Sequence, residues 1–205
     1  MKKEGYLIAI YGINNLGKTT QAKKLVEFLN KNNWAADYVK YPVYRTKPSG
    51  TIINQVLRKD LEQNITEEEF QMWYTINRFQ YEPIILKKME QGHIVVAEDY
   101  IGTGVAWGAT KGANMDWLVD INKPLRQEDL AILFDGERFI DGKEKKHIHE
   151  QDDVLMARCR KWHQKLSEMN GWKVVNANQR IDEVHEDVLE IVSQFLRGSN
   201  IWKEK

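Results

Sequence analysis

Short apolar runs alternate with longer segments in which apolar residues recur at helical spacing along the 205-residue chain. The apolar runs predict strands and the periodic segments predict helices. The predicted strands cover residues 6–11, 35–41, 93–97, 130–134 and 172–176. The predicted helices cover residues 20–30, 51–58, 66–91, 103–108, 115–121, 153–169 and 181–196. Because strands and helices alternate, we expect an α/β fold with a five-stranded parallel sheet and helices on both faces.

This alternation runs through the chain without an internal repeat or a linker, so residues 1–205 predict a single domain. The segment 136–150 differs from the rest because it is polar, lysine-rich and contains glycine. Such a composition is typical of a mobile flap, and we expect a short lid there rather than part of the core.

The segment 66–91 carries the strongest helix signals. It opens with a capping box that begins at Thr66. Apolar residues then recur at roughly helical spacing, at Phe70, Trp73, Tyr74, Ile76, Phe79 and Ile84. Tyr74 and Arg78 lie one turn apart and share a face, so the tyrosine can stack on a base while the arginine donates to its carbonyl edge. The same spacing also fits a core tyrosine beside a surface arginine.

Residues 12–19 read Gly-Ile-Asn-Asn-Leu-Gly-Lys-Thr, which is the pattern G-x-x-x-x-G-K-T. A predicted strand precedes this stretch and a predicted helix follows it, which is the context of a P-loop. The backbone N–H groups of such a loop, with the positive end of the helix, bind phosphate. We expect Lys18 to reach the β and γ phosphates of a bound nucleoside triphosphate, and Thr19 to hold Mg²⁺.

Glu98 and Asp99 follow a predicted buried strand. In a parallel sheet, ligands bind at the carboxyl ends of the strands, where the P-loop, the loop with Arg45, the flap and the turn 176–178 also meet. One of the two acids can help to hold Mg²⁺ through water or accept a proton. The alternative is a turn acid that caps the next helix.

The predicted flap carries the cations Arg138, Lys143, Lys145 and Lys146. One of them is a candidate to close over the transferring phosphoryl group and offset its charge. Each one taken singly also fits an ordinary solvated charge run. His147 and His149 alternate in the same segment, but no cysteine partner lies nearby, so we assign them no metal.

Composition limits the partners. Thirty basic and thirty acidic residues give a formal net charge of zero, which argues against nucleic acid or an acidic membrane as a partner. No apolar run approaches the length of a membrane span, and the start of the chain carries no signal peptide. The single cysteine, Cys159, allows no internal disulfide and fits a reducing cytoplasm. We therefore expect a cytoplasmic protein that binds a small-molecule nucleotide.

The order of these motifs resembles the thymidylate kinase family over most of the chain. Residues 17–21 are similar to that family's G-K-[ST]-T-Q, and Tyr41-Pro42 followed by Arg45 resembles its F-P-x-R loop. Tyr74 with residues 77–79 resembles its base-binding aromatic and N-R-[WF] run. Residues 95–107 resemble V-V-D-R-Y-x-x-S-G-x-A-[FY], residues 174–177 resemble its V-[DN]-A adenine loop, and residues 181–186 match its last helix.

This resemblance implies a P-loop kinase fold and a transfer of the γ-phosphoryl of ATP to dTMP or a related pyrimidine deoxynucleotide. The ATP-binding residues it implies are Gly12, Asn14, Asn15, Leu16, Gly17, Lys18, Thr19, Thr20 and Ala177. The acceptor-binding residues it implies are Tyr41, Arg45, Tyr74, Arg78, Tyr100, Thr103 and Trp107, with Arg45 on the monophosphate and Trp107 crowding the 2′ position of the sugar. The catalytic set is then Lys18, Arg45, Glu98 and Asp99, with Thr19 and Glu98 at Mg²⁺. The resemblance also leaves room for a homodimer.

Several positions depart from the family pattern. Glu98-Asp99 stands in place of its D-R pair, so an acid replaces a phosphate-binding arginine. Asn14 replaces the usual acid of the P-loop, and Asn15 stands where some members carry a catalytic arginine. The flap has residues 148–150, Ile-His-Glu, in place of R-[YF]-E.

These departures keep two alternatives open. The first is a deoxynucleoside kinase that acts on a hydroxyl acceptor with Glu98 or Asp99 as the base. The second is a catalytically weak relative that binds nucleotide and serves as an interaction or regulatory module. A switch GTPase is not expected, because residues 122–125, Asn-Lys-Pro-Leu, lack the aspartate of N-K-x-D.

Overall fold

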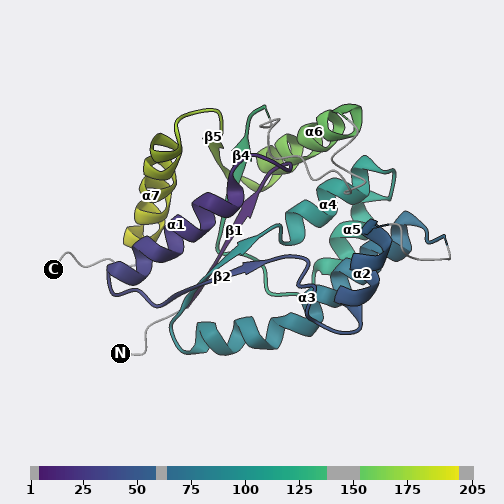
Figure 1. Ribbon diagram of the computed structural model, residues 1–205, viewed down its shortest axis with the longest axis horizontal. Helices are drawn as coiled ribbons and strands as arrows, with labels where there is room; N and C mark the ends of the chain where they lie inside the picture. Colours follow the sequence, from purple (N-terminus) through teal and green to yellow (C-terminus); the bar gives the residue numbers. More distant parts are fainter. Residues whose placement is uncertain (1–4, 59–63, 138–152, 199–205) are drawn as a thin grey trace.

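The computed structural model describes residues 5–58, 64–137 and 153–198 (Figure 1). Its strands are β1 (Tyr6–Tyr11), β2 (Ala36–Lys40), β3 (Ile94–Glu98), β4 (Leu130–Asp135) and β5 (Lys173–Asn176). Its helices are α1 (Lys18–Lys31), α2 (Ser49–Arg58), α3 (Glu67–Glu90), α4 (Ile101–Thr110), α5 (Met115–Asn122), α6 (Asp153–Asn170) and α7 (Ile181–Gly198). Every predicted element is present, and each predicted end lies within two residues of the observed one.

The strands form one parallel sheet in the order β2-β3-β1-β4-β5, which confirms the predicted fold class. β1 lies at the centre, and all six of its residues are buried. Glu98 at the end of β3 lies opposite Ile10 of β1 on one side and opposite Lys40 of β2 on the other. The carboxyl ends of these three strands therefore meet at one edge of the sheet, where α/β proteins bind ligands.

Helices cover both faces of the sheet, as predicted. α1 and α7 pack together on one face, while α3, α4 and α6 lie on the other (Figure 1). α2 packs against α3, and α5 packs against both α3 and α4. In the described ranges, no helix is long and apolar enough to cross a membrane.

The apolar residues of α3 mark its buried face only in part: Phe70, Tyr81 and Ile85 are buried, while other apolar positions are not. Thr66 caps the helix as the capping box predicts, since its Oγ1 accepts a hydrogen bond from the backbone N–H of Glu69 at 3.1 Å. Ile76, Phe79 and Ile84, however, are exposed. The buried positions include the polar residues Gln71, Thr75, Asn77 and Arg78. A helix that lines a polar cleft needs hydrogen-bonding groups on its inner face, and this requirement overrides the apolar pattern.

Asn77 shows what these polar residues do for the fold. Its Nδ2 donates to the carbonyl of Val43 at 3.1 Å and to Oγ of Ser49 at 2.9 Å, while its Oδ1 accepts from the N–H of Val43 at 2.7 Å. A fully buried amide with three partners fixes the loop after β2 against α3. The loop that carries Tyr41 to Arg45 is thereby held in place beside the cleft.

The outer face of α3 carries an apolar stripe, which we define as Met72, Ile76, Phe79 and Leu86. These side chains are 38–45% exposed. Successive members are separated by four, three and seven residues, which is the heptad spacing of a helix that packs along another helix.

The predicted lid, residues 136–150, falls largely outside the described residues. β4 extends to Asp135, and the chain is described to Glu137. Arg138, Lys143, Lys145 and Lys146 lie outside the described ranges, as do both flap histidines. The roles predicted for the flap cations therefore stay predictions.

Helix α6 buries a histidine beside the single cysteine. Cys159 is fully buried, and burial raises the pKa of its thiol to about 12, which suits a core residue rather than a nucleophile. His163 lies one turn later, 1% exposed, with Nδ1 3.0 Å from the carbonyl oxygen of Cys159. Burial lowers the pKa of His163 to about 4. The folded protein therefore keeps this imidazole neutral at pH values at which an unfolded chain protonates it.

This predicts an acid-sensitive core. As pH falls from about 6.5 to about 4, the unfolded state takes up a proton that the folded state does not, so stability is lost across that window by up to about 3 kcal/mol. Denaturant unfolding of wild type and His163→Gln at several pH values measures this loss, because glutamine keeps a donor for the Cys159 carbonyl but does not titrate. We expect the variant to have the flatter curve. Parallel curves for the two proteins would show that His163 is not the titrating group.

Candidate active site

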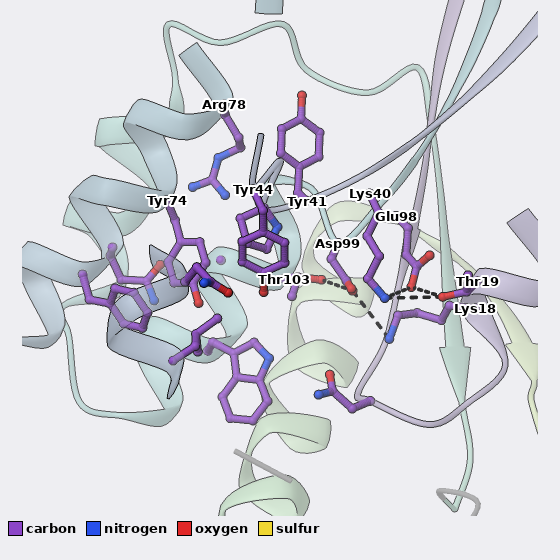
Figure 2. A pocket seen from close by; sticks show the side chains of 18 of the residues that line it. Lys18, Thr19, Lys40, Tyr41, Tyr44, Tyr74, Arg78, Glu98, Asp99 and Thr103 are labelled. Carbon is purple, nitrogen blue, oxygen red and sulfur yellow. Dashed lines mark hydrogen bonds and ion pairs between the residues drawn. The ribbon is translucent and has the colours of Figure 1, made fainter. Parts of the chain in front are cut away.

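One cavity of about 420 Å³ opens where β1, β2 and β3 end. Its walls come from the P-loop, the loop after β2, helices α2, α3 and α4, and the turn at Glu98 and Asp99. Figure 2 shows Lys18, Thr19, Lys40, Glu98 and Asp99 grouped at one end and the aromatic and arginine side chains of α3 at the other. The cavity thus joins a charged end to a base-sized aromatic end.

The P-loop has the conformation that its glycines predict. Gly12 and Gly17 have φ angles of 133° and 75°, values that side-chain-bearing residues rarely adopt. A side chain at Gly12 would also collide with the backbone carbonyl of Phe134 on β4. Lys18 is 4% exposed, and its Nζ donates to the carbonyls of Gly12 and Ile13 at 2.8 and 2.7 Å. The lysine is therefore held on the inner side of the loop, at the floor of the cavity.

The other P-loop candidates divide in two groups. Asn14, Asn15, Leu16, Gly17 and Thr19 line the cavity together with Lys18. Asn15 has a φ of 63°, and its Nδ2 is buried without a hydrogen-bond partner among the described residues. Thr20 is exposed on α1 and is not among the described residues that line the cavity.

Glu98 joins three elements. Its Oε1 accepts hydrogen bonds from Oγ1 of Thr19 on α1 at 2.8 Å and from Nζ of Lys40 on β2 at 2.8 Å. Its Oε2 accepts from the hydroxyl of Tyr38 at 2.5 Å. Burial raises the pKa of Glu98, but the ammonium groups of Lys40 and Lys18 lower it by more, so the net pKa lies below that of an ordinary glutamate. Glu98 is ionised at neutral pH.

The oxygens of Thr19 and Glu98 fit a magnesium ion. Mg²⁺ prefers hard oxygen ligands and is commonly held by one or two carboxylates together with substrate phosphates rather than by a full protein cage. Within the described ranges no three His, Cys, Asp or Glu residues form a self-sufficient metal cluster. The hydroxyl of Thr19 and the carboxylate of Glu98, side by side at the phosphate loop, match the substrate-dependent type of site.

Asp99 has an environment opposite to that of Glu98. Its φ is 61°, an unusual backbone conformation for a residue other than glycine. Its Oδ1 lies 3.5 Å from Nζ of Lys18 and accepts a hydrogen bond from Oγ1 of Thr103 at 3.3 Å. Burial raises the pKa of Asp99 by more than Lys18 lowers it, so the carboxyl is protonated more readily than an ordinary aspartate. Two adjacent acids with pKa values shifted in opposite directions are typical of reactive sites.

At the aromatic end, Arg78 is a buried residue, which excludes the surface-arginine interpretation. It is 2% exposed and lines the cavity together with Tyr74. Its Nε donates to Oδ1 of Asn122 on α5 at 3.0 Å, and its Nη2 donates to Oγ1 of Thr75 at 3.2 Å. A Cβ at Gly104 would lie 3.1 Å from both terminal nitrogens of the guanidinium, so the absence of a side chain at Gly104 makes room for it. Its orientation is thus fixed before any ligand binds.

The sugar-binding candidates divide as well. Tyr41, Thr103 and Trp107 line the cavity. Tyr100 does not belong to this lining in the described chain; it is 1% exposed, and its hydroxyl donates to the backbone carbonyl of Arg126 at 2.9 Å. The tyrosine packs against Tyr41 at a ring distance of 5.1 Å. Tyr100 thus packs in the core beside the cavity, and its predicted contact with the acceptor stays a prediction.

The structure does not bring Arg45 to the cavity. Its Nη2 donates to the hydroxyl of Tyr81 at 3.0 Å, and the residue is exposed. The F-P-x-R spacing, counted from Tyr41, places its fourth position at Tyr44, and it is Tyr44 that lines the cavity. Arg45 comes one residue too late for the motif, and its side chain leaves the loop on the side of α3.

Ala177 also lies away from this cavity. It is 2% exposed, and its N–H donates to the carbonyl of Asp135 at 2.8 Å. Asn178 binds both the N–H and the carbonyl of Glu137, at 2.7 Å each. The turn after β5 is therefore tied to the start of the predicted lid.

Lys40 is the site residue that the sequence reasoning missed. Its Nζ contacts Glu98 at 2.8 Å and Oγ1 of Thr19 at 3.4 Å, and it lines the cavity. A signal was present, because Lys40 is the second-last residue of the strand predicted over residues 35–41, and the carboxyl end of that strand faces the site. That signal depends on knowing that β2 pairs with β3 in the register that sets Lys40 opposite Glu98.

Known proteins that resemble this chain in sequence and in structure belong to one family. The sequence model of the family described as thymidylate kinase matches residues 10–188. A probable thymidylate kinase of Pyrococcus abyssi is 30% identical over 95% of this chain and 98% of its own length. The human thymidylate kinase is 28% identical over 98% of this chain and 99% of its own.

Among solved structures, the thymidylate kinase of Candida albicans superimposes with a TM-score of 0.83 at 22% identity, covering 97% of this chain and 94% of that one. This likeness confirms the fold. The family match and the relatives confirm the resemblance drawn from the motifs. The chain belongs to the thymidylate kinase family.

Proposed function

We propose that the protein transfers the γ-phosphoryl group of ATP to dTMP in the cytoplasm. The observation that carries this proposal is that one cavity contains the P-loop lysine with the Thr19–Glu98 pair at one end and Tyr74 with Arg78 at the other. A donor triphosphate on the P-loop and a pyrimidine against α3 then share one space. The one cysteine is buried and unpaired, which suits a reducing compartment.

The chemistry requires positioning and charge more than a base. The acceptor oxygen of a monophosphate is already anionic, so no proton has to be removed before attack. Lys18, whose Nζ donates to the carbonyls of Gly12 and Ile13, would neutralise charge on the transferring group. Thr19 and Glu98 would hold Mg²⁺, which neutralises phosphate charge when bound.

Base recognition falls to α3 and α4. Tyr74 offers a ring face for stacking, and the fixed guanidinium of Arg78 offers planar donors to a carbonyl edge. Thr103 and Trp107 on α4 also line the cavity, and the sugar would lie against them. Asn122 and Thr75 orient Arg78 without contributing to the cavity lining themselves.

A second candidate function follows from Asp99. A buried carboxyl with a raised pKa beside the P-loop lysine is also what a kinase of neutral hydroxyls needs as a general base. In that case thymidine or another deoxynucleoside would be the acceptor. The dTMP assignment stays our first choice, because the acceptor oxygen of a monophosphate is already anionic and needs no base.

We also propose a homodimer through the α3 stripe. Met72, Ile76, Phe79 and Leu86 form a continuous exposed apolar line at heptad spacing. Two copies of α3 packed along this line would bury it and leave the cavity, on the inner face of the helix, open.

The function is tested with Lys18→Ala in a coupled assay of ADP release. Wild type should release ADP in the presence of dTMP, and the variant should lose about 10²- to 10³-fold or more in kcat while keeping its fold, because the charge that stabilises the transferring group is removed. Lys24→Ala is the matched control, since Lys24 lies on the same helix but pairs with Asp182 on the surface at 2.7 Å. ATP binding without acceptor-dependent ADP release by wild type would instead support a catalytically weak, nucleotide-binding relative.

Asp99→Asn separates the two acceptor classes. With dTMP as acceptor we expect a KM equal to or several-fold below that of wild type, because a carboxyl near the acceptor dianion is replaced by a neutral amide that still accepts from Thr103. Initial rates over a range of dTMP concentrations and of thymidine concentrations give KM and kcat for both acceptors. If wild type prefers thymidine and Asp99→Asn loses about 10²-fold or more in kcat with thymidine, then Asp99 is a base and the acceptor is a nucleoside.

The homodimer is tested with Ile76→Glu. A charge in the middle of the stripe should convert a dimer into a monomer, because the dimer interface would desolvate the new carboxylate without offering it a partner. Sedimentation velocity at several concentrations gives the masses. Ile84→Glu is the control, since Ile84 is equally exposed on α3 but lies off the stripe. A wild type that stays monomeric throughout would rule the stripe out as a dimer interface.

A further inference from the structure

The charged end of the cavity has fewer cations than an acceptor phosphate requires. Glu98 and Asp99 place two carboxyls there, and the described cations near them are Lys18 and Lys40. A monophosphate brought to this end adds up to two further negative charges. Its binding therefore depends on which cation is available to it.

Two further cations that line the cavity, Arg58 and Lys111, each have a partner near their own helix. Nε of Arg58 donates to Oδ1 of Asn54 at 3.0 Å on the same helix. Nζ of Lys111 lies 3.0 Å from a carboxylate oxygen of Glu67. Arg45 binds Tyr81 outside the cavity. Among the described residues, the cations in contact with the Glu98–Asp99 turn are therefore Lys18 and Lys40.

Lys18 is assigned to the donor phosphates by the proposed function, and its ammonium group already has three neighbours at the P-loop. An ammonium group has three N–H donors, and those of Lys18 are directed to the carbonyls of Gly12 and Ile13 at 2.8 and 2.7 Å and toward Asp99 at 3.5 Å. The side chain is 4% exposed. It is committed to the floor of the P-loop, beneath the donor phosphates.

Lys40, in contrast, has donors available. Its Nζ makes one short hydrogen bond, to Oε1 of Glu98 at 2.8 Å, and a long one to Thr19 at 3.4 Å. Its side chain is 52% exposed, against 2% for Glu98.

The sheet fixes the backbone position of Lys40, while the ammonium group at the end of its side chain can move. The parallel register places Lys40 opposite Glu98, and the next residue, Tyr41, donates its N–H to the Glu98 carbonyl at 2.9 Å. The four-carbon stem of a lysine can turn its charge over several ångströms. Glu98 retains the hydroxyls of Thr19 and Tyr38 when the lysine turns away, so it is not left as an unpaired buried charge.

We propose that Lys40 is the residue that binds the phosphate of the acceptor nucleotide in this protein. It pairs with Glu98 while the cavity is empty and turns to the acceptor phosphate when the nucleotide binds. The proposal rests on the proposed function, since it takes the acceptor to be a monophosphate. The rival explanation is a purely structural ion pair between β2 and β3.

The test measures binding without ATP, metal or turnover. Calorimetric titration with dTMP and with thymidine gives two dissociation constants. The ratio of the thymidine constant to the dTMP constant reports what the phosphate contributes to binding. In wild type we expect dTMP to bind more tightly than thymidine. Lys40→Gln should reduce the ratio about ten- to a hundredfold, the range of a charge-assisted contact, and leave the thymidine constant within about twofold.

Two controls accompany this variant. Arg45→Gln should leave the ratio unchanged, because Arg45 binds Tyr81 outside the cavity. Lys40→Met keeps an apolar stem and removes the charge, so it should reduce the ratio to the same extent as Lys40→Gln. It serves as the second variant in case the amide of Lys40→Gln disturbs the fold. Thermal unfolding of each variant checks that the protein titrated is folded.

An unchanged ratio in folded Lys40→Gln or Lys40→Met would overturn the proposal, and so would a loss of the ratio in Arg45→Gln alone. Equal weakening of dTMP and thymidine would point to the structural ion pair and overturn it as well. If wild type binds the two ligands equally, no phosphate contact exists and the proposal fails. ADP release by wild type with dTMP is judged separately, so a failure at Lys40 is distinguishable from a failure of the proposed function.

Discussion

The hydrogen bonds of Glu98 connect the parts of this protein that have to act together. The carboxylate lies at the end of β3, next to the central strand, and receives Thr19 from the phosphate loop and Tyr38 and Lys40 from β2. A buried carboxylate needs such partners, because the cost of desolvating an unpaired charge is several kcal/mol. The requirement to satisfy Glu98 therefore sets the distance between the P-loop and the loop after β2, which together form the charged end of the cavity.

The fold was largely predictable because its signals are local. Apolar runs, one capping box and the glycines of the P-loop depend on neighbours in sequence, and they located the strands and helices to within two residues. Lys18, Thr19 and Glu98 followed from motif and strand position together. The strand order β2-β3-β1-β4-β5 was not predicted, since it depends on contacts between distant segments.

The site was less predictable where a side chain's direction decides its role. Arg45 and Tyr44 differ by one position in a loop, and the loop turns only one of them into the cavity. Tyr100 fits its motif but packs in the core. Lys40 belongs to no motif in the chain, and its role follows from a strand register that a single sequence does not reveal. Helix α3 shows the same limit, because its polar residues face inward to serve the cavity.

The support of Arg78 has a consequence for how this protein can change over evolutionary time. The guanidinium is aimed by Asn122, a residue of α5 that belongs to another helix and is 2% exposed. Gly104, on a third helix, leaves the space that the guanidinium occupies. Under the role proposed for Arg78, the choice of base would therefore be encoded partly at Asn122, which is not among the described residues that line the cavity. Drift toward a new substrate would then have a route through α5 that leaves the lining side chains chemically intact.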